Sequence, residues 1–85
     1  MKSFRYTITD EIGIHARPAG MLVKEAKKYK SNIVLFADEK QADVKKLMAL
    51  MSLGIKKGQS VEIRAEGEDE EEAIRAMEHF FENNL

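Results

Sequence analysis

The sequence contains no cysteine, no tryptophan and a single proline among its 85 residues. Without cysteine, disulfide bonds and thiolate metal sites are excluded, and such a composition suits a reducing compartment. No run approaches the roughly 20 apolar residues that cross a bilayer, and residues 1–10 lack the apolar segment of a signal peptide. We therefore expect a cytoplasmic protein that does not insert into membranes.

An excess of charge of either sign is also lacking. The chain has 14 basic and 15 acidic residues and a formal net charge of −1, which argues against a general nucleic-acid binder. Two distant histidines without thiols do not make a metal site, so we expect neither a metal nor a cofactor. The length and the apolar fraction of 44% fit one globular domain, residues 1–85.

Hydrophobic periodicity predicts four strands and three helices. Strands are expected where apolar and polar residues alternate, and helices where apolar residues recur at helical spacing. The expected strands are 4–9, 33–37, 40–43 and 61–66, and the expected helices are 16–28, 45–53 and 70–84. This β-α-β-β-α-β-α order predicts an α+β open-faced β-sandwich, with three helices on one face of a four-stranded antiparallel sheet.

Three local signals refine these boundaries. Asp38 and Glu39 are expected to turn a hairpin into a short edge strand, residues 40–43. Gly54 is expected to end the second helix in a left-handed conformation. Asp69, followed three residues later by Glu72, is typical of a capping box at the start of the last helix.

The segment with the most chemical information surrounds His15, which stands immediately before a predicted helix. Arg17 and Pro18 follow in the first turn, where the missing N–H of proline removes no hydrogen bond. The backbone N–H groups of Ala16 and Arg17 lack intrahelical partners, so the helix start is suited to an anion. An imidazole nucleophile beside a guanidinium and these N–H groups predicts a seat for a phosphoryl group.

The pattern Gly13-Ile14-His15-Ala16-Arg17-Pro18-Ala19 closely resembles the active-site motif of the HPr family, the histidine phosphocarriers of the bacterial sugar phosphotransferase system. The resemblance extends over essentially the whole chain, including segments 45–54 and 67–70. It implies that Nδ1 of His15 accepts a phosphoryl group from enzyme I and passes it to IIA domains of sugar permeases. Arg17 would hold the phosphoryl oxygens. It also implies a carrier without independent turnover. Such a carrier presents one site to successive partners, so we expect it to act as a monomer.

The predicted second helix presents more apolar residues than one core-facing stripe requires. The resemblance places Met48 in a surface that docks partners, whereas the spacing of Leu47 and Met51 fits either a docking surface or the core. Gly20 would let a partner approach the first helix, although it could simply be a weak point of that helix. The basic residues of the two helices would form a rim that attracts an acidic partner, unless they are only a solvated face; they are Arg17, Lys24, Lys27, Lys45 and Lys46.

The main departure from the family is Lys46, at a position where many members carry a serine that a regulatory kinase phosphorylates. Lysine cannot take this phosphate, so the sequence argues against serine control. Ile12, where members often carry a polar residue, is a smaller departure. A second function remains open, namely a regulatory interaction module that signals to transcriptional or metabolic regulators. A third is an α+β binding domain in which His15 is incidental.

Overall fold

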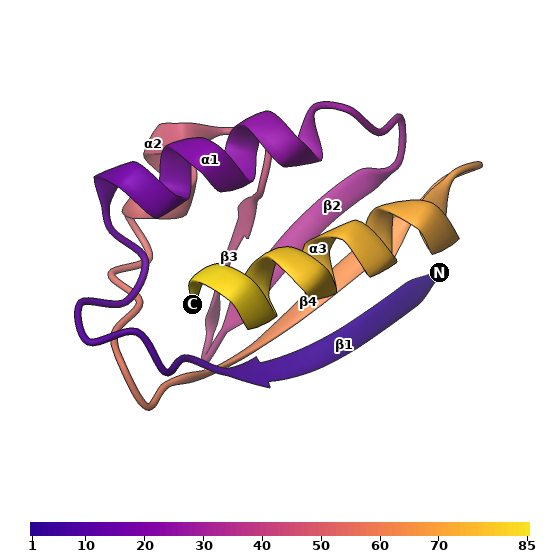
Figure 1. The fold of residues 1–85 in the computed structure, drawn as a ribbon. Coiled ribbons are helices and arrows are strands. Elements are labelled where there is room, and N and C mark those ends of the chain that lie inside the picture. The colour runs from indigo at the N-terminus through magenta and orange to yellow at the C-terminus, as the bar shows by residue number, and fades with distance from the viewer.

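Four antiparallel strands form one sheet, and three helices cover a single face of it (Figure 1). This computed structural model describes all 85 residues. The elements are β1 (Lys2–Thr7), α1 (Ala16–Ala26), β2 (Asn32–Ala37), β3 (Lys40–Asp43), α2 (Leu47–Met51), β4 (Ser60–Glu66) and α3 (Glu70–Asn84). The strand order is β1-β4-β2-β3, and every neighbouring pair is antiparallel. The predicted open-faced sandwich is confirmed.

The core lies between the sheet and the helices. In β4, Val61, Ile63 and Ala65 are buried, while the alternating residues of that strand point to the helix-free face. Phe81 of α3 is fully buried and packs edge-to-face on Phe4 and Tyr6 of β1, with ring centroids 5.7 and 5.6 Å apart. Because α1 and α3 run antiparallel across this face (Figure 1), the start of α1 and the end of α3 lie at the same end of the molecule.

Two helices are shorter than the periodicity predicted. Helix α1 ends at Ala26, two residues early, and the chain then turns towards β2. Helix α2 spans five residues, Leu47–Met51, instead of 45–53. Its predicted first turn is replaced by an extended Lys46, after the Asp43 carboxylate has accepted a hydrogen bond from the Lys45 N–H at 2.9 Å. Helix α2 therefore begins at Leu47, two residues later than predicted, and Lys46 offers no side-chain oxygen to cap it.

The predicted turns and the edge strand are confirmed. Asp38 adopts a positive φ of 55°, which aspartate tolerates better than most residues, and Glu39 does not need one. The hairpin leads into β3 at the edge of the sheet. Gly54 has the predicted positive φ, 62°, but it lies two residues after the cap residue Ser52 instead of directly after it.

The predicted capping box at Asp69 is wrong. Asp69 is the residue before α3, but its carboxylate makes no cap hydrogen bond. It instead accepts hydrogen bonds from the backbone N–H groups of Lys30 and Ser31, at 2.8 and 2.9 Å, and from the Ser31 hydroxyl at 2.5 Å. Asp69 therefore ties the loop after α1 to the start of α3, a long-range contact that local sequence spacing does not reveal.

This contact predicts a specific sensitivity to acid. Hydrogen bonding, chiefly from the Ser31 hydroxyl and then the Lys30 N–H, lowers the pKa of Asp69 below its ordinary value of 3.8. A carboxyl group with a lowered folded-state pKa stabilises the fold above its unfolded-state pKa, and this contribution is lost as the pH falls through the folded-state value. We expect Asp69→Ala to lower the free energy of unfolding at neutral pH and to differ less from wild type below pH 3.8.

Urea unfolding of both proteins between neutral pH and strong acid measures this difference. As a control, Glu68→Ala changes a neighbouring carboxylate that is 75% exposed and contacts only the Lys30 side chain, at 3.5 Å. That variant should track wild type across the pH range. A stability difference between Asp69→Ala and wild type that stays constant down to strong acid would contradict the assignment.

No helix in the structure combines the length and the apolar composition needed to span a bilayer.

Candidate functional site

His15 is positioned by a tight turn that is hydrogen-bonded to the segment after α2. The Gly13 N–H donates to the Asp10 carbonyl at 3.2 Å, and the Ile14 N–H donates to the Ile55 carbonyl at 3.0 Å. Gly13 has a φ of 85°, and a side-chain carbon there would collide with the Ile55 carbonyl oxygen. Only glycine tolerates both the positive φ and the close approach of the Ile55 carbonyl. Gly13 therefore fixes the position at which the chain leaves the turn towards His15.

The start of α1 provides unpaired hydrogen-bond donors next to His15. His15 has an extended backbone and its carbonyl accepts the first helical hydrogen bond, from the Ala19 N–H at 2.9 Å. The N–H groups of Ala16 and Arg17 precede this bond and have no partner in the protein, and Pro18 has no N–H. The helix start therefore has the two free N–H donors that the sequence predicted.

A shallow hollow of about 290 Å³ opens beside this helix start. It is lined by His15, Arg17, Pro18 and Met21 from the α1 region, by Asp10 from the preceding turn, and by Asn84 from the end of α3. The predicted pair, His15 and Arg17, thus faces one space. The Arg17 side chain forms no hydrogen bond or ion pair with the protein, so all of its donors are available to a ligand.

Two polar residues of this hollow were missed by the sequence analysis. Asp10 places Oδ2 at 3.9 Å from Nε2 of His15, and the two side chains are 35% and 39% exposed. The spacing of Asp10 from Gly13 is a recognisable turn signal, although it does not reveal contact with the histidine. Asn84 reaches the hollow only because α3 ends beside the start of α1, and no local pattern indicates that approach.

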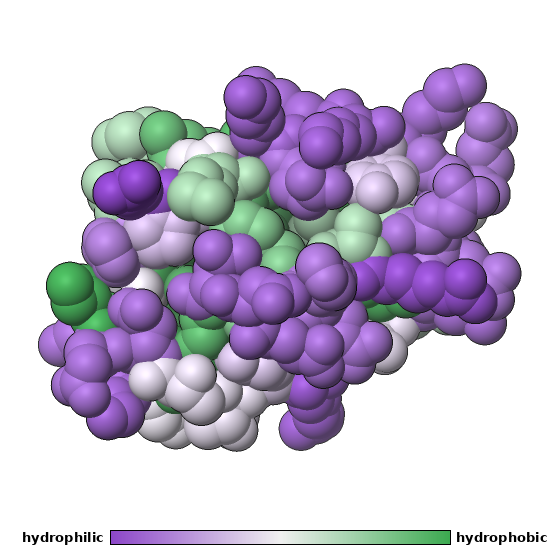
Figure 2. All heavy atoms as spheres, viewed as in Figure 1, coloured by the Kyte–Doolittle hydropathy of each residue, from purple (hydrophilic) through white to green (hydrophobic).

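An exposed apolar surface lies on α2 and the adjoining part of α1. Met48 is 80% exposed, Leu47 40% and Met51 36%, whereas Leu50 alone is fully buried. The sequence left open whether Leu47 and Met51 lie in the core or on the surface, and in the structure both are exposed. Met21 of α1 is 46% exposed and lines the His15 hollow. Figure 2 shows apolar surface over α2 and the first part of α1, at the upper left, beside a predominantly hydrophilic surface.

Polar and small residues surround this apolar surface. Lys24 on α1 is exposed, as are Lys27 directly after α1 and Lys46 before α2. Lys45 differs, because its ammonium group donates to the Tyr29 carbonyl at 2.7 Å and so joins the segment before α2 to the loop after α1. A side-chain carbon added at Gly20 would meet no atom within 4 Å, so the protein itself does not require glycine there.

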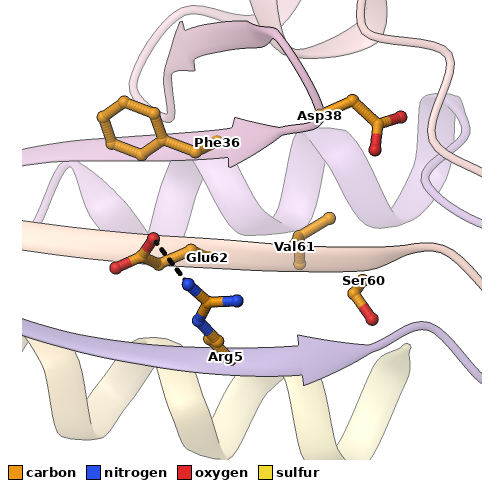
Figure 3. Close-up of a pocket in the computed structure, with 6 residues that line it drawn as sticks. All are labelled: Arg5, Phe36, Asp38, Ser60, Val61 and Glu62. Atoms are coloured by element: carbon orange, nitrogen blue, oxygen red, sulfur yellow. Dashed lines mark ion pairs between the residues drawn. The ribbon is translucent and has the colours of Figure 1, made fainter.

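Another hollow, of about 300 Å³, lies on the helix-free face of the sheet (Figure 3). It is lined by Arg5, Phe36, Asp38, Ser60, Val61 and Glu62. Its charges are largely balanced within the sheet, since Glu62 accepts hydrogen bonds from Arg64 at 3.1 and 3.3 Å and lies 4.0 Å from Arg5. The Arg64 hydrogen bond is the main cause of the lowered pKa of Glu62. This hollow offers no nucleophile comparable to His15.

Comparison with known proteins places the whole chain in one group. Residues 2–83 match the family model described as PTS HPr component phosphorylation site. The chain is 47% identical over 77 residues to phosphocarrier protein HPr of Mycoplasma capricolum subsp. capricolum, covering 91% of this chain and 86% of that protein. It is 45% identical to HPr of Mycoplasma genitalium, covering 99% and 97% of the two chains. A solved structure of a Mycoplasma histidine-containing phosphocarrier protein superposes with a TM-score of 0.94 at 43% identity, covering 96% and 93%.

Proposed function

Since the chain belongs to the HPr family of phosphocarrier proteins of the phosphotransferase system, we propose that Nδ1 of His15 is its phosphoryl acceptor. In this proposal enzyme I donates the group, and IIA domains of sugar permeases receive it. The relay operates in the cytoplasm with the carrier as a monomer. The observation that carries the proposal is the convergence of His15, Arg17 and the free N–H groups of Ala16 and Arg17 at one hollow.

The chemistry of phosphoryl transfer favours this arrangement. The transferred group carries negative charge on three oxygens, and the protein contributes mainly by positioning the reactants and stabilising that charge. Arg17 supplies a permanent positive charge with several donors, and the helix start adds two aligned N–H dipoles. Nε2 of His15 faces Asp10, at 3.9 Å from its carboxylate, which leaves Nδ1 as the nitrogen available for attack.

The exposed apolar surface formed by Leu47, Met48 and Met51 is the docking site in this proposal. Helix α2 packs against α1, which also carries Met21 of the hollow, so a partner that docks on α2 would lie close to the element that presents His15. Methionine side chains adapt their shape and suit a surface that accepts several partners. Gly20 leaves room on α1, while Lys24 and Lys27 attract acidic partner surfaces.

Replacement of Met48 by alanine should change the affinity for enzyme I while leaving the stability of the fold nearly unchanged. We expect Met48→Ala to weaken binding to enzyme I by about tenfold, the effect of losing roughly 1.4 kcal/mol of contact energy. The free energy of unfolding should change by no more than about 0.5 kcal/mol, because the side chain is 80% exposed. Titration calorimetry and urea unfolding measure the two quantities.

The matched control is Leu50→Ala on the same helix. Leu50 is fully buried, so its truncation should lower the free energy of unfolding by about 2–5 kcal/mol. While folded, that variant should bind enzyme I with nearly wild-type affinity. Unchanged binding by Met48→Ala would remove Met48 from the docking site.

Lys46 bears on regulation in this proposal. Its side chain is exposed at the start of α2, and it has no hydroxyl that a kinase could phosphorylate. The carrier is therefore independent of serine control at this position. A regulatory module, which would pass its phosphorylation state to transcriptional or metabolic regulators, is a second candidate. The exposed methionine surface beside His15 suits either role, and the identity of the phosphoryl recipient separates them.

Incubation with phosphoenolpyruvate and enzyme I tests the proposed function. Intact-mass measurement should show one phosphate added per chain, and this phosphate should be lost in acid and retained in base, as a phosphoramidate is. A parallel reaction without enzyme I should leave the mass unchanged. Absence of phosphate, or an acid-stable phosphate that indicates a hydroxyl ester, would contradict a histidine carrier.

A further inference from the structure

Asp10 makes two kinds of contact with a single carboxylate oxygen. Its Oδ2 accepts hydrogen bonds from the N–H groups of Ile12 and Gly13, both at 3.1 Å, and so closes the turn before His15. The same oxygen lies 3.9 Å from Nε2 of His15. The turn hydrogen bonds hold the carboxylate in place, and its negative charge therefore has a fixed position beside one particular nitrogen of the ring.

Asp10 carries the only carboxylate within 4.0 Å of a His15 ring nitrogen. Glu11 is adjacent in sequence, but its carboxylate is 84% exposed and pairs with the Lys57 ammonium at 2.8 Å. The remaining charged side chain that lines the hollow is Arg17, which carries the opposite sign. Asp10 is thus distinguished from a general acidic surface by its distance from the ring and by the turn hydrogen bonds that anchor it.

The charge has a use in the phosphoryl transfer proposed above, on which this inference rests. When Nδ1 attacks phosphorus, an N–P bond forms, and the bond between phosphorus and the donor breaks, with its electron pair remaining on the donor. A neutral ring that bears its proton on Nε2 thereby gains a positive charge. That proton lies on the side of the ring that faces Asp10. The negative carboxylate therefore stabilises the new positive charge without taking the proton.

We infer that Asp10 is a positioning residue for His15. Its carboxylate favours the ring form that carries the proton on Nε2, keeps Nδ1 free for the phosphoryl group, and stabilises the positive ring formed by transfer. The pattern Asp10-x-x-Gly13-x-His15 therefore combines a turn-closing acid with an electrostatic partner of the histidine.

Asp10→Asn tests this inference because the amide oxygen can still accept both turn hydrogen bonds while the charge is gone. We expect phosphorylation by phospho-enzyme I under single-turnover conditions to slow by about fivefold, the factor that corresponds to about 1 kcal/mol. Nitrogen-15 shifts of the neutral His15 ring should show a smaller share of the form protonated on Nε2. A merely structural role would not change that share. Glu11→Gln, the matched control, should behave as wild type in both measurements.

The outcomes distinguish this inference from the proposed function. If wild type takes no phosphate, the carrier proposal itself fails. If wild type and Asp10→Asn are phosphorylated at equal rates with the same ring protonation, the positioning role is excluded. A slower variant with unchanged ring protonation and a shifted Gly13 amide resonance would also overturn it, because Asp10 would then act only through the turn.

Discussion

His15→Ala is expected to take up no phosphoryl group from phospho-enzyme I. The imidazole is the proposed nucleophile. Of the other polar side chains of the hollow, Arg17 and Asn84 are not nucleophiles, and the Asp10 carboxylate accepts the hydrogen bonds of the turn. The loss should be complete within the detection limit of intact-mass measurement. Because the side chain is 39% exposed and makes no cap hydrogen bond, the free energy of unfolding should remain within about 0.5 kcal/mol of wild type.

The second histidine provides the control for this variant. His79 is exposed on α3 and does not line the hollow. His79→Ala should therefore accept one phosphate per chain at the wild-type rate. Phosphate on the folded His15→Ala protein, or its loss from His79→Ala, would place the acceptor elsewhere in the molecule.

Arg17→Ala is expected to slow phosphoryl transfer to His15 by about 100-fold. Removal of one donor that is aimed at developing negative charge typically costs a factor of this size, and Arg17 supplies a full charge as well. A cation in the first turn of a helix opposes the helix dipole, and α1 has no acidic residue there. Stability should accordingly be unchanged or slightly higher in the variant, because Arg17 has no partner in the protein.

Rapid-quench measurement of the first turnover gives the rate, and thermal unfolding gives the stability. Arg17→Lys retains the charge but loses the planar set of donors, so its rate should lie between those of wild type and alanine. Lys24→Ala removes a charge of the same sign that lies further along α1, and it should affect mainly the salt dependence of association. A rate for Arg17→Ala within twofold of wild type would show that Arg17 does not contact the transferred group.

The sequence predicted most of the architecture because its strands and helices have clear periodicity. Alternation in β4 and the apolar stripe of α3 each place their buried residues correctly, as Ile63 and Phe81 show. The helix start at His15 was also predictable, since histidine, arginine and proline occur there within four residues. These features depend on neighbours along the chain, which a single sequence displays directly.

The features that the sequence did not reveal depend on contacts between distant segments. Asp69 has the local spacing of a capping residue, yet hydrogen bonds from Ser31, 38 positions away, outweigh the cap. Asn84 meets the His15 hollow because of the packing of α3. The exposure of Met51 was undecided for the same reason, since the periodicity of a helix as short as α2 does not specify which side the core occupies.

Nuclear magnetic resonance of the nitrogen-15-labelled protein after phosphorylation by phosphoenolpyruvate and enzyme I is the most direct test of the account. Coupling to phosphorus-31 should be found at Nδ1 of His15 alone, while Nε2 of that ring and both nitrogens of His79 remain uncoupled. Coupling at Nε2 of His15, or at His79, or phosphate on an oxygen atom, would contradict the central claim that the helix start beside Asp10 and Arg17 presents Nδ1 of His15 as the acceptor.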